Sequence, residues 1–192
     1  PNVVIVKNRS IAKYWAVYHS SLGNTKALNL DSSAVPDTDN TYWQNTTPTS
    51  TVFSVGTNSG NNSGNAMVAY SFAQKQGYSK FGSYTGNNNA NGTFVYLGFK
   101  PAFVMVKRTS ATQGWIMWDN KRPGFNLTNQ SLTANETGAE ETGRTFDMLS
   151  NGFKLRNTNT ATNAASTYIY LAFAENPFVT STDNNSIPAT AR

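Results

Sequence analysis

The chain has 192 residues, of which 38% are hydrophobic and only 13% charged, with a net charge of +5 and no cysteine. The missing cysteine excludes disulfides, thiolate metal sites and cysteine nucleophiles, and every apolar run is far shorter than the roughly 18 residues that a membrane-spanning helix needs. The basic residues stand singly or in pairs, a pattern that does not form the stripe needed to follow a nucleic-acid backbone.

The apolar segments of the first half are short, β-branched and aromatic, and clusters of Gly, Asn, Pro and Ser separate them. This pattern predicts strands rather than helices. The predicted elements are, in chain order, a strand at 3–7, a strand at 14–19, a long connection at 20–50, a strand at 52–56, a turn at 57–65 and a strand at 67–73.

The next stretch, FGSYTGNNNANGTFVYLGF at 81–99, has two aromatic-rich segments around a turn of Asn and Gly. Asn and Gly accept the backbone angles of tight turns, so the stretch predicts a β-hairpin.

After this stretch the sequence repeats itself. PAFVMVKRTS at 101–110 aligns without gaps with PNVVIVKNRS at 1–10, and Trp115 aligns with Trp15. Near the ends of the two copies, Phe173 aligns with Phe72. Because the two tryptophans match across the repeat, we expect both to lie in the core.

These observations predict an all-β fold, a pseudo-symmetric β-sandwich built from two internal repeats with a connecting hairpin, because short strands cannot bury both faces alone. The expected parts are a first unit at 1–76, the hairpin at 77–99, a second unit at 100–178 and a C-terminal tail at 179–192, all within one compact domain.

The segments VKNRS, GYSKFGSYTGN, LSNGFKLR, TYIYLAFAENPF and PATAR, in this order, resemble a repeated all-β domain of marine phage tail-fibre and virion surface proteins. The resemblance implies a structural protein on the surface of the phage particle, with a role in assembly and host attachment. It also implies self-association, expected as a homotrimer, contacts with other virion proteins, and further chain before residue 1. A capsid decoration protein is an alternative.

Enzymatic activity is not expected. His19 is the sole histidine and aligns with Asp119 in the second copy, so we expect a partly exposed side chain without a catalytic role. Glu140 and Glu141 would point to opposite sides of an extended segment, unlike the paired carboxylates of a polysaccharide depolymerase. We expect no metal and no cofactor, although the aspartates of the long connection could bind calcium as an alternative. These aspartates are Asp31, Asp37 and Asp39.

Aromatic side chains next to amides are typical of carbohydrate binding, since a sugar offers both apolar C–H faces and hydroxyl groups. Two such places have no counterpart in the other copy. A carbohydrate-binding module that recognises a host surface glycan is therefore an alternative function, with its ligand-binding residues predicted at Tyr42, Trp43, Tyr84, Asn87, Asn88 and Asn89.

Overall fold

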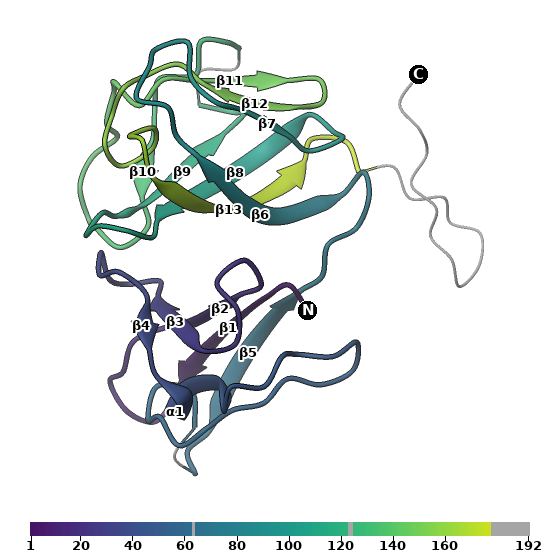
Figure 1. Ribbon diagram of the computed structural model, residues 1–192, viewed down its shortest axis with the longest axis vertical. Helices are drawn as coiled ribbons and strands as arrows, with labels where there is room; N and C mark the ends of the chain where they lie inside the picture. The colour runs from purple at the N-terminus through teal and green to yellow at the C-terminus, as the bar shows by residue number, and fades with distance from the viewer. Residues whose placement is uncertain (63, 123–124, 178–192) are drawn as a thin grey trace.

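The computed structural model describes residues 1–62, 64–122 and 125–177, so the predicted tail at 179–192 lies outside the described residues. Strands dominate this part of the chain, and one helical turn accompanies them (Figure 1). The elements are β1 (Val3–Asn8), β2 (Ala16–His19), β3 (Lys26–Asn29), β4 (Asp37–Thr38), α1 (Asn40–Trp43), β5 (Met67–Phe72), β6 (Ser79–Thr85), β7 (Phe94–Tyr96), β8 (Pro101–Arg108), β9 (Trp115–Asp119), β10 (Leu132–Thr133), β11 (Phe146–Leu149), β12 (Gly152–Leu155) and β13 (Thr167–Ala174).

The strands form three antiparallel sheets. The first sheet has the order β4-β3-β2-β1-β5, the second β10-β9-β8-β13-β6, and the third β11-β12-β7. In Figure 1 the second sheet lies between the other two, and α1 lies on the far side of the first sheet. The all-β sandwich predicted from the sequence is confirmed.

The repeat is visible in the strand register. β1 pairs with β2 and β5, and β8 pairs in the same way with β9 and β13. Val3 lies opposite Phe72, while Phe103 lies opposite Phe173, so corresponding residues occupy corresponding places in the ladder. The two copies therefore fold into the same four-stranded arrangement, since β3 and β10 also take equivalent positions.

The first and second sheets bury their apolar faces against each other. Phe72 of the first sheet meets Phe173 of the second edge to face, with ring centroids 5.8 Å apart. Each fully buried aliphatic side chain contributes roughly 1.5–3 kcal/mol, so this layer holds the two units together. Its buried members are Val3, Val17, Leu28, Phe81, Trp115, Ile169 and Leu171.

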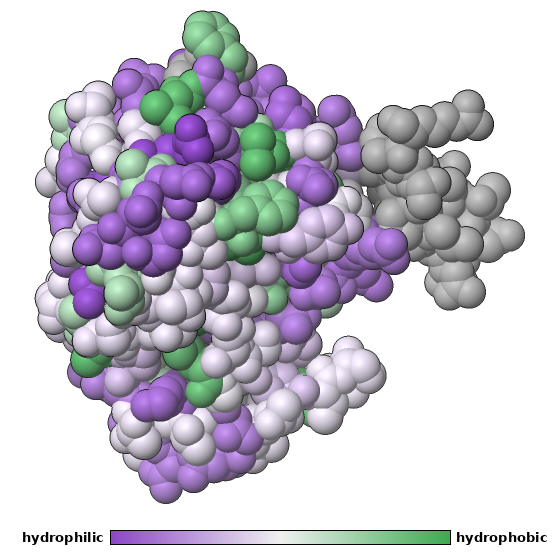
Figure 2. All heavy atoms as spheres, turned by 45° about the horizontal axis from the view of Figure 1, so that its top comes forward, coloured by the Kyte–Doolittle hydropathy of each residue, from purple (hydrophilic) through white to green (hydrophobic). Residues whose placement is uncertain are grey.

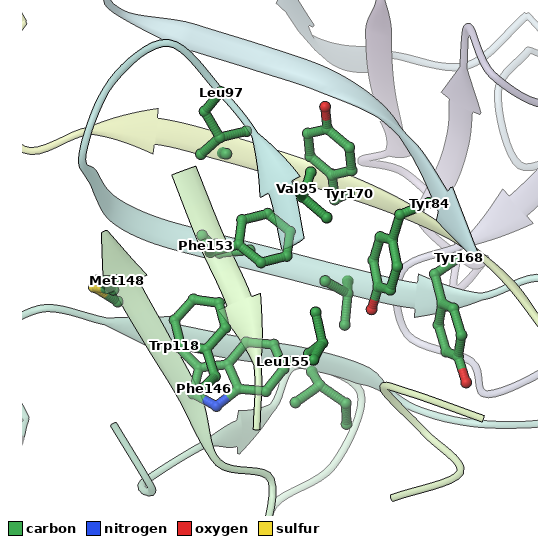
Figure 3. Packing of buried hydrophobic residues seen from close by; sticks show 14 of the residues in the cluster. Tyr84, Val95, Leu97, Trp118, Phe146, Met148, Phe153, Leu155, Tyr168 and Tyr170 are labelled. Atoms are coloured by element: carbon green, nitrogen blue, oxygen red, sulfur yellow. The ribbon is translucent and has the colours of Figure 1, made fainter. Parts of the chain in front are cut away.

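The outer faces of the two units are covered differently. The third sheet covers the second, and Trp118 and Phe146 stack there with ring centroids 4.7 Å apart (Figure 3). On the first sheet, α1 and the loop around Phe53 take this place. The repeat therefore extends to the strands but not to what covers them.

Two of the predicted secondary-structure elements are wrong. Residues 77–99 contain β6 and β7, yet β6 pairs with β13 and β7 with β12, so no hairpin forms. Phe81 and Tyr84 of β6 enter two different cores, because both faces of the middle sheet are covered. Residues 52–56 form no strand, because the amide of Gly56 donates to the carbonyl of Tyr42 at 2.7 Å instead of joining a ladder.

His19 is fully buried between the two units, in contrast to the partly exposed position predicted for it. Its Nε2–H donates to the carbonyl of Tyr170 at 3.1 Å, and its Nδ1 accepts from the amide of Ser21 at 3.2 Å. A neutral ring satisfies both contacts, whereas a charged ring would turn a second donor toward an amide. Burial lowers the pKa of His19 to about 4.

We expect His19 to destabilise the protein in mild acid. The unfolded chain binds the imidazole proton near pH 6.5, but the folded protein binds it only near pH 4, so stability falls as the pH drops between these values. The loss is about 3 kcal/mol. Urea unfolding at pH 7 and pH 4 measures this loss of unfolding free energy. In His19→Gln, which keeps a donor for the carbonyl of Tyr170, the loss between the two pH values should be smaller by about the same 3 kcal/mol. An equal loss in both proteins would contradict the assignment.

The tryptophans should differ in their contribution to stability. Trp115 and Trp43 are almost completely buried, whereas Trp15, which the repeat predicts in the core, is only half-buried. Trp115→Ala and Trp43→Ala should each lower the free energy of unfolding by about 3–5 kcal/mol, and Trp15→Ala by less than half as much. Denaturant unfolding of the three variants gives the order, and a loss at Trp15 as large as at Trp43 would refute it.

Candidate functional site

The predicted aromatic platform of Tyr42 and Trp43 lies in the core. Asp39 caps α1 by accepting from the amide of Thr41 at 2.7 Å, and the turn directs both rings onto the first sheet. Trp43 packs edge to face on Tyr18 with ring centroids 5.9 Å apart. Since only 8% of Tyr42 and 2% of Trp43 are exposed, neither ring offers a face to a sugar.

Tyr84 is also unavailable to a ligand. It points into the core between the second and third sheets (Figure 3), and its hydroxyl donates to the carbonyl of Thr162 at 2.6 Å. Burial holds the pKa of this hydroxyl well above its usual value.

The three asparagines that follow Tyr84 are exposed, but their loop is tied to Asn163. The amide of Asn88 donates to the backbone carbonyl of Asn163 at 2.7 Å, and Asn163 Nδ2 donates to Asn87 Oδ1 and to the carbonyl of Asn89. Asn88 has a positive φ of 52°, which asparagine tolerates. These residues shape a turn, and Tyr84, the ring predicted to bind a ligand beside them, is buried.

The surface of the first unit around Lys7 and Tyr14 is accessible to solvent. A depression of about 600 Å³ is lined by Lys7, Ala12, Lys13, Tyr14 and Asp31. Trp15 lies next to its lining residue Lys7, and Tyr70 lies next to Trp15.

The rings of Trp15 and Tyr70 are stacked, with centroids 6.4 Å apart and an angle of 25° between the planes. Tyr14 is 57% exposed and Tyr70 48%, so aromatic surface is accessible here. We call the depression, together with the stacked rings of Trp15 and Tyr70, the Lys7–Trp15 face.

Backbone and side-chain contacts fix this face. The amide of Trp15 donates to Asp31 Oδ1 at 2.9 Å. The ammonium group of Lys7 donates to the carbonyl of Lys13 and lies 5.9 Å from the centre of the Trp15 ring. A cation over an aromatic ring is attracted to it, so Lys7 and Trp15 orient each other.

The equivalent residues of the second unit, Lys107 and Trp115, are buried. Lys107 is fully buried and donates to the carbonyl of Ser33 at 3.2 Å, and Trp115 Nε1 donates to the carbonyl of Asn29 at 2.9 Å. Burial lowers the pKa of Lys107 to about 8. Residues 29–33 of the first unit thus cover the second unit's pair, whereas in the described part of the chain no hydrogen bond from the second unit reaches Lys7 or Trp15.

Sequence reasoning missed the Lys7–Trp15 face because it treated the two copies as equivalent. The available signal was the sequence AKYW at 12–15, where Lys13 and Tyr14 stand beside Trp15, while the second copy has TQGW at 112–115. The second copy lacks both the extra aromatic and the extra cation.

The acidic residues considered for catalysis or metal binding are used elsewhere. Glu140 pairs with Arg122, and Glu141 pairs with Arg144 at 2.8 Å. Among the described residues, no group of three or more His, Cys, Asp or Glu side chains is arranged to hold a metal ion. The aspartates at 31, 37 and 39 therefore do not gather into a calcium site in this structure.

The view of Figure 2 shows hydrophobic residues in separate small patches among polar ones. In the described part of the chain, no helix is long and apolar enough to cross a membrane.

Neither the curated proteins nor the solved structures contain a match to this chain. One family matches residues 1–177. The chain belongs to this family, which is described as a domain of unknown function, DUF7483.

Proposed function

We propose that this chain is a non-catalytic structural and attachment domain on the surface of a phage particle, and that it binds carbohydrate through the Lys7–Trp15 face. The resemblance to repeated tail-fibre domains supports the location, and the site geometry supports the binding. Host attachment requires a rigid body that presents a recognition surface. The buried layer between the two sheets supplies such a body.

The observation that carries the proposal is the accessible aromatic pair of Trp15 and Tyr70 beside an open polar depression. A sugar ring packs its C–H face on an aromatic ring while its hydroxyls bind nearby polar groups. Here the polar groups are the ammonium of Lys13, the hydroxyl of Tyr14 and the carboxylate of Asp31. Both kinds of contact are thus available on one side of the molecule.

Tyr70→Ala tests the binding. The variant should lose about tenfold in affinity for any glycan that the protein binds on a glycan array, because a stacking contact contributes about 1 kcal/mol or more. Tyr96→Ala is the matched control, since Tyr96 is 59% exposed and has a lysine, Lys80, over its ring. Equal binding by the two variants, or no glycan binding by the unmodified protein, would overturn the proposal.

A second candidate function is self-association through the edge of β5. This strand is the edge of the first sheet, and its equivalent, β13, is covered on the same side by β6. Residues 66–74 carry no charge and no proline, the features that usually protect an edge. The opposite edges, β4 and β10, are only two residues long.

The partner we propose for this edge is β5 of a second copy. The amide of Arg9 donates to the carbonyl of Ala66, so alternate residues from 66 to 72 face β1, and the backbone of Met67, Ala69 and Ser71 faces outward. Two such edges pair antiparallel about a twofold axis without placing like charges opposite each other. This contact gives a dimer, whereas the trimer remains a prediction of the resemblance.

Ala69→Pro removes an outward amide without touching the ladder to β1. We expect the unmodified protein to run as a dimer in size-exclusion chromatography with light scattering, and the variant as a folded monomer. Ala69→Lys should act in the same way by charging the edge. Ser83→Lys, on the edge of the second sheet, is the control and should remain dimeric. An unmodified protein that is monomeric, or variants that stay dimeric, would contradict this contact.

A further inference from the structure

The second unit contains an internal example of what the Lys–Trp pair binds. Lys107 and Trp115 occupy the same places in β8 and β9 as Lys7 and Trp15 in the first unit. Residues 29–33 of the first unit cover the Lys107 and Trp115 side chains. Backbone oxygens of this segment accept hydrogen bonds from the Lys107 ammonium group and from the Trp115 indole N–H. The pair therefore binds a segment that offers oxygen acceptors next to an apolar surface.

The first unit's pair has the same donors without such a segment. Trp15 Nε1 makes no hydrogen bond within the described residues, and the Lys7 ammonium makes one, to the carbonyl of Lys13. Neither Lys7 nor Lys13 forms an ion pair in this part of the chain. Two cations and an indole N–H are thus available around one depression.

The one carboxylate in the depression does not balance these cations. Asp31 Oδ1 already accepts a hydrogen bond from the amide of Trp15. In the second unit Asn135 takes this role, accepting from the amide of Trp115 at 2.8 Å, which shows that the position serves the backbone and needs no charge. The lining side chains of the depression therefore carry a net charge of +1.

We propose that the ligand of the Lys7–Trp15 face is an acidic glycan, whose carboxylate or sulfate is bound by Lys7 and Lys13 while a sugar ring lies on Trp15 and Tyr70. This inference rests on the proposed carbohydrate binding and adds the class of ligand. A neutral hydroxyl gains little from an exposed ammonium group, because water competes for it equally well. An anionic group gains a charge-assisted hydrogen bond.

The experiment compares matched ligands that differ only in charge. The first pair is an oligogalacturonate and its methyl ester, which tests the carboxylate, and the second is dextran sulfate and dextran, which tests the sulfate. Titration calorimetry at low ionic strength should show about tenfold tighter binding of at least one acidic form than of its neutral partner. Added salt should reduce this preference, because salt screens exposed charges.

Lys7→Met should reduce the preference for the acidic form several-fold, because Lys13 alone then attracts the anion, and it should weaken binding of the acidic form more than binding of the neutral form. Lys7→Arg should restore most of the preference. Lys80→Met is the matched control, because Lys80 also lies over a ring, that of Tyr96, and its loss changes the net charge by the same amount. This control should bind both forms as the unmodified protein does.

The outcomes separate the two proposals. Equal binding of acidic and neutral forms, with a loss in Tyr70→Ala, overturns the acidic ligand and keeps the carbohydrate site. A preference for the acidic form that weakens equally in the Lys7 and Lys80 variants reflects net charge alone and also overturns the inference. Binding of none of the four glycans overturns the acidic ligand, and the glycan array then decides about the site itself.

Discussion

The contact between the first and second sheets is the constraint on which the rest of the structure depends. Each four-stranded unit has an apolar face that it cannot bury alone, and the two units solve this by packing face to face, with Phe72 against Phe173 at the centre of an aromatic cluster. The middle sheet then has a second apolar face, which the third sheet covers. The same contact buries His19, whose counterpart in the second copy is Asp119, a half-buried carboxylate bound to Arg122.

Duplication of a unit does not duplicate its environment. The two units share their strand order and register. Residues 29–33 nevertheless reach across to Lys107 and Trp115, and nothing comparable in the described residues reaches Lys7 and Trp15. The same pair of side chains therefore serves as a cross-link in one unit and remains open in the other. The covered pair contributes to stability, and the open pair is the one for which a ligand is proposed above. A repeat protein can obtain a binding face in this way without a new motif.

The sequence predicted the strands and the sandwich because short alternating segments and the repeat depend on local pattern and on the need to bury one face. It did not predict which loops are buried. Tyr42 and Trp43 stand among polar residues, and only the capped turn at Asp39, seen in three dimensions, brings them onto the first sheet. Trp15 and Trp115 are equivalent in the sequence, and their different exposure follows from the relative placement of the units. The hairpin prediction failed for a similar reason, since β6 and β7 pair with β13 and β12, strands that lie far along the chain.

Apolar packing alone would leave the two sheets free to slide, because hydrophobic contact is not directional. Three side chains remove this freedom by donating across the layer to backbone carbonyls: His19 to Tyr170, Trp115 to Asn29 and Lys107 to Ser33. Sliding would leave the buried donors of His19 and Trp115 unpaired, at a cost of about 1–3 kcal/mol each, and would leave Lys107 with only the carbonyl of Arg108. The hydrogen bonds thus select one relative position of the units. That position keeps residues 29–33 over Lys107, and it is therefore also what leaves the Lys7–Trp15 face uncovered.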